Sequence, residues 1–90
     1  MRSTRLTIVN SLGLHARAAA QLVRLAASFK SKIVLSRTDN NVFADAKSIL
    51  SLLTLAAAKG IELEITVTGD DEDRAFQAVE ALFVGGFGEL

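Results

Sequence analysis

The sequence predicts a small α+β domain, an open-faced two-layer sandwich in which a four-stranded antiparallel sheet is covered on one face by three helices. Along the 90 residues, the spacing of apolar side chains changes between two, as in strands, and three or four, as in helices. These changes give the element order βαββαβα. The clearest strand is apolar on one side only, which favours an antiparallel sheet with one covered face and one face in water.

The composition limits the class of protein. Half of the residues are hydrophobic, which is enough for the core of one domain over residues 1–90. The absence of cysteine excludes a disulfide framework, and ten basic residues balance ten acidic ones, so the net charge offers no general attraction to nucleic acid or membranes. Apolar runs are too short for a membrane span, and residues 1–10 lack a signal-peptide core. We therefore expect a cytoplasmic domain.

The first half of the chain is predicted to form a strand, a helix and a hairpin. Residues 4–9 alternate like a strand, and residues 16–28 carry apolar side chains on one helical face. Strands over 32–36 and 41–45 flank the polar turn at 38–41, where Asn and Asp tolerate a left-handed backbone. Because a short hairpin joins them, these two strands should be antiparallel.

The second half should contain a helix, a strand and a final helix. The helix spans roughly residues 48–58, and residues 61–68 show the most regular strand alternation in the chain. The last helix starts in an acidic run, where Asp70 or Asp71 is a suitable N-cap. The glycine-rich residues 85–90 are expected to form a frayed tail.

The junction between the first strand and the first helix carries the main chemical signal. His15, the only histidine, lies at or near the N-cap of the helix, and Arg17 lies in its first turn. The free N–H groups and partial positive charge of a helix N-terminus favour phosphate. A neutral imidazole is a nucleophile, and a guanidinium fork matches phosphate oxygens. This arrangement suggests phosphoryl transfer onto His15, although a polar loop residue without function also fits the pattern.

The helix predicted over 48–58 holds more large apolar residues than one buried face needs. Three of its residues are placed facing the core: Leu52, Leu55 and Ala56. Ile49, Leu50 and Leu53 are then left at the surface, where an apolar patch usually marks a site for a partner. The alternative is a helix that is buried nearly all round. Ser48 is the expected N-cap of this helix.

Two motifs together resemble a known family. They are Gly13-Leu14-His15-Ala16-Arg17 followed by Ala18-Ala19, and Ala46-Lys47-Ser48-Ile49 about thirty residues later. In order and separation they resemble HPr, the histidine phosphocarrier of the bacterial phosphoenolpyruvate-dependent phosphotransferase system, over nearly the whole chain. The resemblance implies that enzyme I phosphorylates His15 on Nδ1, that Arg17 holds the phosphoryl group, and that an EIIA-type domain receives it.

The resemblance also implies a carrier rather than an enzyme, a monomer with no cofactor. A metal site is not expected, because one histidine without cysteine cannot supply the usual ligands. Ser48 matches the serine that an HPr kinase/phosphorylase modifies in some bacteria. Ile49, Leu50 and Leu53 match the apolar surface on which the partners dock.

Some features differ from the usual HPr pattern. Ala18 occupies a position that is often proline, and a position late in the second helix that is often glycine is alanine here. Both the sugar-transport and the nitrogen-related branches of the system remain open. So do two other readings, a small ligand-binding regulatory module of ACT type, which has a similar element order, and an HPr-like protein with a purely regulatory role.

Overall fold

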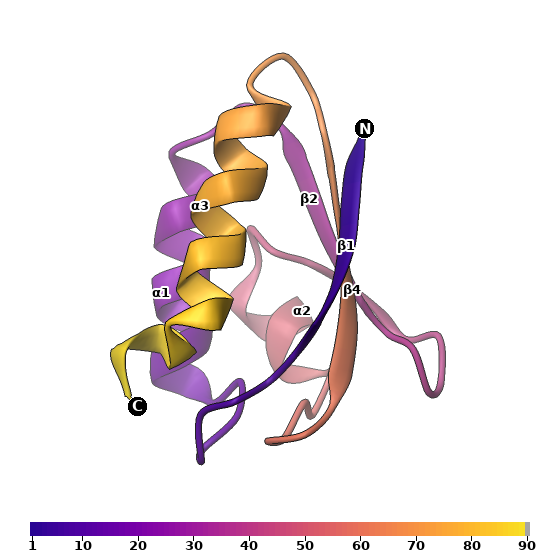
Figure 1. Ribbon diagram of the computed structural model, residues 1–90, viewed down its shortest axis with the longest axis vertical. Helices are drawn as coiled ribbons and strands as arrows, with labels where there is room; N and C mark the ends of the chain where they lie inside the picture. The colour runs from indigo at the N-terminus through magenta and orange to yellow at the C-terminus, as the bar shows by residue number, and fades with distance from the viewer. Residues whose placement is uncertain (90) are drawn as a thin grey trace.

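The computed structural model describes residues 1–89 (Figure 1). Its elements, in chain order, are β1 (Arg2–Thr7), α1 (Ala16–Ala27), β2 (Lys32–Arg37), β3 (Phe43–Asp45), α2 (Ile49–Leu53), β4 (Glu62–Thr68), α3 (Glu72–Val84) and the 3-10 turn η1 (Gly86–Gly88). The predicted order βαββαβα is confirmed, with η1 added after the last helix. No helix within these residues is long and apolar enough to cross a membrane.

The four strands form one antiparallel sheet in the order β1-β4-β2-β3. β4 pairs with β1 on one side and with β2 on the other, so Leu63 lies opposite Leu6 and Ile65 lies opposite Leu35. All three helices lie on the same face of this sheet (Figure 1). The predicted open-faced sandwich is therefore confirmed.

The core lies between the inner face of the sheet and the helices. Alternate residues of β4 are buried, namely Leu63, Ile65 and Val67, while the residues between them are on the open face. α1 contributes small side chains and one large one, Ala18, Ala19, Leu22 and Ala26, all fully buried. Full burial of a Leu or Ile side chain contributes about 1.5–3 kcal/mol, so this layer supplies the main cohesion of the domain.

α2 is shorter than the sequence predicted. It covers Ile49–Leu53 rather than residues 48–58, because Ala56 adopts a left-handed conformation with a φ of 47°. The chain then runs in a non-helical path, and the Leu14 amide donates to the Ala57 carbonyl at 2.8 Å. Leu52 and Leu55 face the core as predicted. The prediction for Ala56 is wrong: it is exposed, and Ala57 is buried in its place.

Two strand boundaries also differ from the prediction. The first strand is Arg2–Thr7 rather than residues 4–9, because its pairing with β4 extends from Arg2 opposite Val67 to Thr7 opposite Glu62. The third strand is Phe43–Asp45 rather than residues 41–45. Asn41 has a φ of 57° and belongs to the hairpin turn, as its tolerance of the left-handed region allows.

The start of α3 is held by side chains in a way that the sequence did not predict. Asp71 occupies the N-cap position, but its carboxylate makes no capping bond. Instead it accepts hydrogen bonds from the Ser31 hydroxyl at 2.5 Å and from the backbone amides of Lys30 and Ser31. These bonds lower the pKa of Asp71 to about 2, and the bond from the Ser31 hydroxyl has the largest effect. Asp71 therefore joins α3 to the turn between α1 and β2.

The prediction of a frayed tail is wrong for residues 85–89. η1 turns the chain back toward the domain, and Phe87 is buried with only 3% of its surface exposed. Its ring packs edge-on against Phe83, with centroids 4.9 Å apart. Leu90 lies outside the described residues. In Figure 1 this yellow end of the chain lies beside the purple beginning of α1.

Candidate functional site

His15 is the N-cap residue of α1, as predicted. Its backbone is extended, with φ of −80° and ψ of 179°, and its carbonyl accepts the first bond of the helix from Ala19 at 2.8 Å. The imidazole makes no capping bond within the described residues, and the first turn contains no acidic residue. The first amide groups of a helix lack intrahelical acceptors, so the space beside His15 faces donors and partial positive charge.

The loop before α1 fixes the position of His15. Gly13 has a φ of 64°, and its amide donates to the Asn10 carbonyl at 3.1 Å. A Cβ at this position would lie 2.5 Å from the Ala57 carbonyl oxygen. The next residue, Leu14, is buried and bonded to Ala57. The glycine therefore allows the loop to approach the segment after α2 closely.

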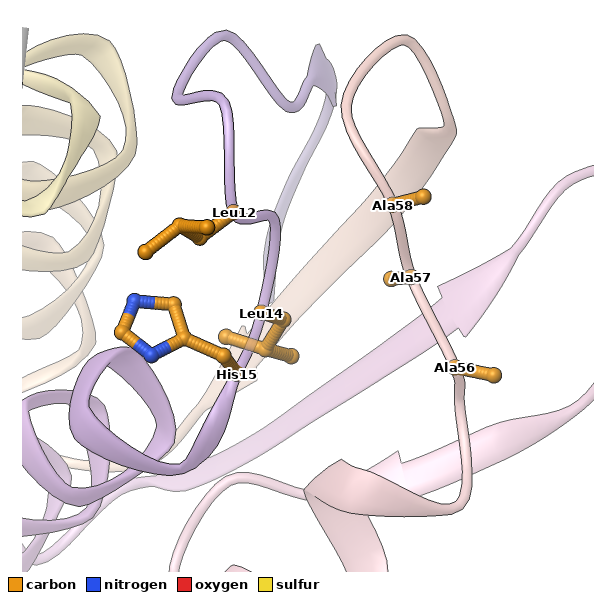
Figure 2. Close-up of a pocket in the computed structure, with 6 residues that line it drawn as sticks. All are labelled: Leu12, Leu14, His15, Ala56, Ala57 and Ala58. Carbon is orange, nitrogen blue, oxygen red and sulfur yellow. The ribbon is translucent and has the colours of Figure 1, made fainter.

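An open depression of about 220 Å³ lies beside the imidazole (Figure 2). Its lining residues are Leu12, Leu14, His15, Ala56, Ala57 and Ala58. In Figure 2 the His15 ring lies beside Leu12, and the three alanines form the opposite wall. The side chains in this wall are small and apolar, so the depression leaves room next to His15 for a group carried by another molecule.

A glutamate after η1 contacts the imidazole directly. The Oε2 atom of Glu89 lies 2.6 Å from Nε2 of His15, and Oε1 accepts a hydrogen bond from Nδ2 of Asn10 at 2.9 Å. The bonds from Asn10 and from His15 lower the pKa of Glu89, with smaller charge effects of His15 and Arg17. Glu89 is therefore ionised beside the ring at neutral pH.

Sequence analysis missed Glu89 and Asn10 as residues of this site. Glu89 lies 74 residues from His15 and falls in the segment predicted to be frayed. Asn10 is buried, with 1% of its surface exposed, and its amide also donates to the Gly13 carbonyl at 2.9 Å. Its one sequence signal was its place in a turn, which does not distinguish a site residue from an ordinary turn asparagine.

Arg17 lies in the first turn of α1, as predicted, and its side chain is exposed. Within residues 1–89 its guanidinium forms no ion pair closer than 4 Å, although its charge contributes to the low pKa of Glu89. Arg17 and Glu89 thus place opposite charges near one imidazole. The guanidinium keeps its donors free for an incoming anion.

Ser48 and the apolar residues that follow it are arranged as predicted. The Ser48 hydroxyl caps α2 by accepting a hydrogen bond from the Ser51 amide at 3.2 Å. Ile49, Leu50 and Leu53 expose 40%, 78% and 39% of their surface. We call these three residues the α2 patch. The chain leaving α2 forms the alanine wall beside His15, so the patch and the imidazole belong to neighbouring parts of one surface.

A comparison with protein families shows which family the chain belongs to. A family model described as the PTS HPr component phosphorylation site matches residues 2–84. The chain belongs to the HPr family. This confirms the resemblance seen in the sequence, and it selects a phosphocarrier of the phosphotransferase system over the ACT-type alternative.

Individual HPr-family proteins are similar over almost the full length. The phosphocarrier protein HPr of Cupriavidus necator is 46% identical over 92% of this chain and 91% of its own length. The phosphocarrier protein NPr of Escherichia coli K12 is 44% identical over 91% of this chain and 90% of its own. A crystal structure of HPr from Thermoanaerobacter tengcongensis superposes with a TM-score of 0.92 at 34% identity, covering 100% and 99% of the two chains.

Proposed function

We propose that this chain accepts a phosphoryl group on His15 from enzyme I and passes it to an EIIA-type domain. The observation that carries the proposal is an imidazole at the N-terminus of α1 that makes no capping bond and lies in the same helix start as the free guanidinium of Arg17. Because the chain belongs to the HPr family, the donor and the acceptor are proposed to be those of the phosphotransferase system. The chain works in this relay as a stoichiometric carrier in the cytoplasm, and as a monomer.

The transfer is a simple displacement. A lone pair of the imidazole forms a bond to phosphorus, the bond from phosphorus to the donor breaks, and its electron pair stays with the donor. Arg17 and the free amides of the first turn of α1 stabilise the oxygens of the phosphoryl group. The same steps in reverse, with an acceptor in the depression beside His15, hand the group on.

The test of this proposal uses phosphoenolpyruvate, enzyme I and the purified chain. The wild type should gain about 80 Da, the mass of one phosphoryl group, as an acid-labile and base-stable modification. His15→Ala should gain nothing while remaining folded in a thermal melt, because the imidazole makes no capping bond and its contact with Glu89 lies outside the core. Continued phosphorylation of the variant on another residue would refute the assignment.

The partner surface is proposed to be the α2 patch. Apolar side chains exposed this far beside a reactive group are suited to docking the enzyme I and EIIA-type surfaces. Ser48 lies at the edge of this patch, half-buried at the start of α2. We propose that an HPr kinase/phosphorylase, where the host has one, modifies it, since phosphate is tolerated at a helix N-terminus but adds charge to the docking surface.

Two Ser48 variants separate the regulatory role from the capping role. Ser48→Asp keeps an N-cap acceptor and should fold normally but bind enzyme I more weakly, seen as a higher KM for phosphoryl uptake. Ser48→Ala should transfer at a near-normal rate and lose about 1 kcal/mol of stability with the cap. Equal KM values for Ser48→Asp and the wild type would leave Ser48 as a helix cap only.

The relatives named HPr and NPr are almost equally similar to this chain, at 46% and 44% identity. The enzyme I that acts as phosphoryl donor therefore has to distinguish the sugar branch from the nitrogen-related branch. Initial rates of phosphoryl uptake from the enzyme I of the sugar branch and from that of the nitrogen-related branch, measured in parallel, will assign it.

A further inference from the structure

The segment that forms the alanine wall beside His15 contains an unfavourable backbone conformation. Ala56 has a φ of 47°, in the left-handed region that an alanine rarely adopts without support. The next residue, Ala57, accepts the hydrogen bond from the amide of Leu14, which directly precedes His15. The path of this segment therefore sets both the shape of the depression and its connection to the loop before α1 (Figure 2).

Arg37, the last residue of β2, holds the segment on both sides of Ala56. Its Nη1 atom donates to the carbonyl oxygens of Leu55 and Ala56, at 3.0 and 3.3 Å. These two carbonyls belong to the peptide groups before and after Ala56, and the φ and ψ of Ala56 are the rotations between those groups. Because both carbonyls share one donor, a rotation out of the left-handed region would break at least one of the two bonds.

The guanidinium is itself fixed in position. Its Nε and Nη2 atoms donate to the two carboxylate oxygens of Asp39, at 2.9 and 2.6 Å, a bidentate arrangement that sets the plane of the group. The Arg37 backbone lies opposite Leu63 in the sheet, and its amide donates to the Val42 carbonyl at 3.0 Å. Only 16% of the Arg37 side chain is exposed. A rigid part of the sheet thus supports a strained part of the loop.

We infer that Arg37 is a positioning residue for phosphoryl transfer, which keeps Ala56 left-handed and so shapes the wall that a partner contacts beside His15. The inference rests on the proposed function and adds to it the residue that sets the form of the entry to the imidazole. Arg37 acts through the backbone after α2 and does not contact the phosphoryl group.

The effect of Arg37 on the loop before α1 can be measured without enzyme I. Arg37→Met keeps the aliphatic part of the side chain and removes all of its donors. The Leu14 amide should then exchange with deuterium about tenfold faster than in the wild type, the change expected from the loss of hydrogen bonds to a charged group. The amides of β4 should change less, because their exchange requires the sheet to open.

The kinetic test measures phosphoryl uptake from enzyme I by the same variant. Arg37→Met should raise KM by about fivefold with little change in kcat, because a smaller fraction of the chain presents the wall in its docking form. A loss of stability alone would change neither constant well below Tm, where the chain stays folded. Arg5→Met is the matched control: Arg5 pairs with Glu64 on the open face of the sheet, and this variant should match the wild type.

Further variants test the backbone argument directly. In the Arg37→Met background, Ala56→Gly should bring KM back toward the wild-type value, because glycine adopts the left-handed conformation without a donor to hold it. Ala58→Gly, at a wall residue that has no positive φ, should not. Asp39→Asn, which removes the charge that orients the guanidinium, should give the same changes as Arg37→Met in smaller size.

The inference is overturned if either KM or the Leu14 exchange rate of Arg37→Met equals that of Arg5→Met. It is also overturned if Ala58→Gly restores KM as well as Ala56→Gly does. If the wild type takes up no phosphoryl group on His15, the proposed function fails, and the Leu14 exchange still shows whether Arg37 holds the wall. If the wild type is phosphorylated and Arg37→Met behaves like Arg5→Met, only the role of Arg37 fails.

Discussion

Gly13 is the point at which the loop before α1 comes closest to the segment after α2, and Gly13→Ala tests whether this approach positions His15. An alanine here would have to keep a φ of 64°, which costs a non-glycine residue about 1–2 kcal/mol. Its Cβ would lie 2.5 Å from the Ala57 carbonyl oxygen and 2.8 Å from the Ala58 Cα. Both are backbone atoms, so one of the two segments must move.

Such overpacking costs about a further 1–3 kcal/mol, while the lower entropy of the unfolded chain returns about 0.4–1 kcal/mol. The expected net loss is about 1–5 kcal/mol, which corresponds to a decrease in Tm of at least about 4 °C for a domain of this size. The displaced loop should also shift His15 and slow phosphoryl uptake from enzyme I.

Gly60→Ala is the matched control. Gly60 also has a positive φ, 90°, but no atom lies within 4 Å of the place where its Cβ would be. Gly60→Ala should therefore lose stability only through its positive φ, without a steric clash, and should leave phosphoryl uptake unchanged. The assay is urea and thermal unfolding of both variants, together with initial rates of uptake. Equal losses of stability and equal rates for the two variants would show that the close approach at Gly13 does not position the site.

Four other variants test separate parts of the structure. Arg17→Lys should slow phosphoryl uptake, because an ammonium group lacks the bidentate fork, while Arg24→Lys, an exposed residue on the same helix, should not; equal rates would reduce Arg17 to a point charge. Ala56→Gly should raise the stability by about 0.5–1 kcal/mol in urea unfolding, since it relieves a left-handed alanine with φ of 47°. Leu50→Asp should weaken enzyme I binding in titration calorimetry without lowering Tm, because the side chain is 78% exposed. Asp71→Asn should flatten the fall of Tm on acidification. The pKa of Asp71 is lowered from 3.8 to about 2 on folding, so its contribution is complete above pH 4 and is lost as the pH falls to about 2.

The sequence predicted best those features that depend on neighbouring residues. His15 and Arg17 follow from the helix start, because a cap and a first turn are set by residues within one turn of each other. The capping role of Ser48 and the exposure of Leu50 follow in the same way from helical spacing. The alternation of β4 was clear because its two faces meet different environments.

The errors occur where a distant contact outweighs local preference. Residues 56–58 are three alanines, which favour helix by propensity, yet the bond from the Leu14 amide to Ala57 draws them into a non-helical path. Gly85, Gly86 and Gly88 suggested a loose tail, but the burial of Phe87 against Phe83 fixes the turn. Neither contact leaves a periodic pattern in the sequence.

The functional site also combines features that depend on neighbouring residues with one that depends on a distant contact. The positive environment that suits a phosphoryl group comes from the start of α1 and from Arg17, and is local to the motif that the sequence displays. The negative charge beside the ring comes from Glu89, which reaches His15 only because η1 folds back and Phe87 is buried. The His-x-Arg motif at the helix start therefore accounts for the cationic side of the site. Its anionic side depends on a carboxylate that only the tertiary fold brings to the ring.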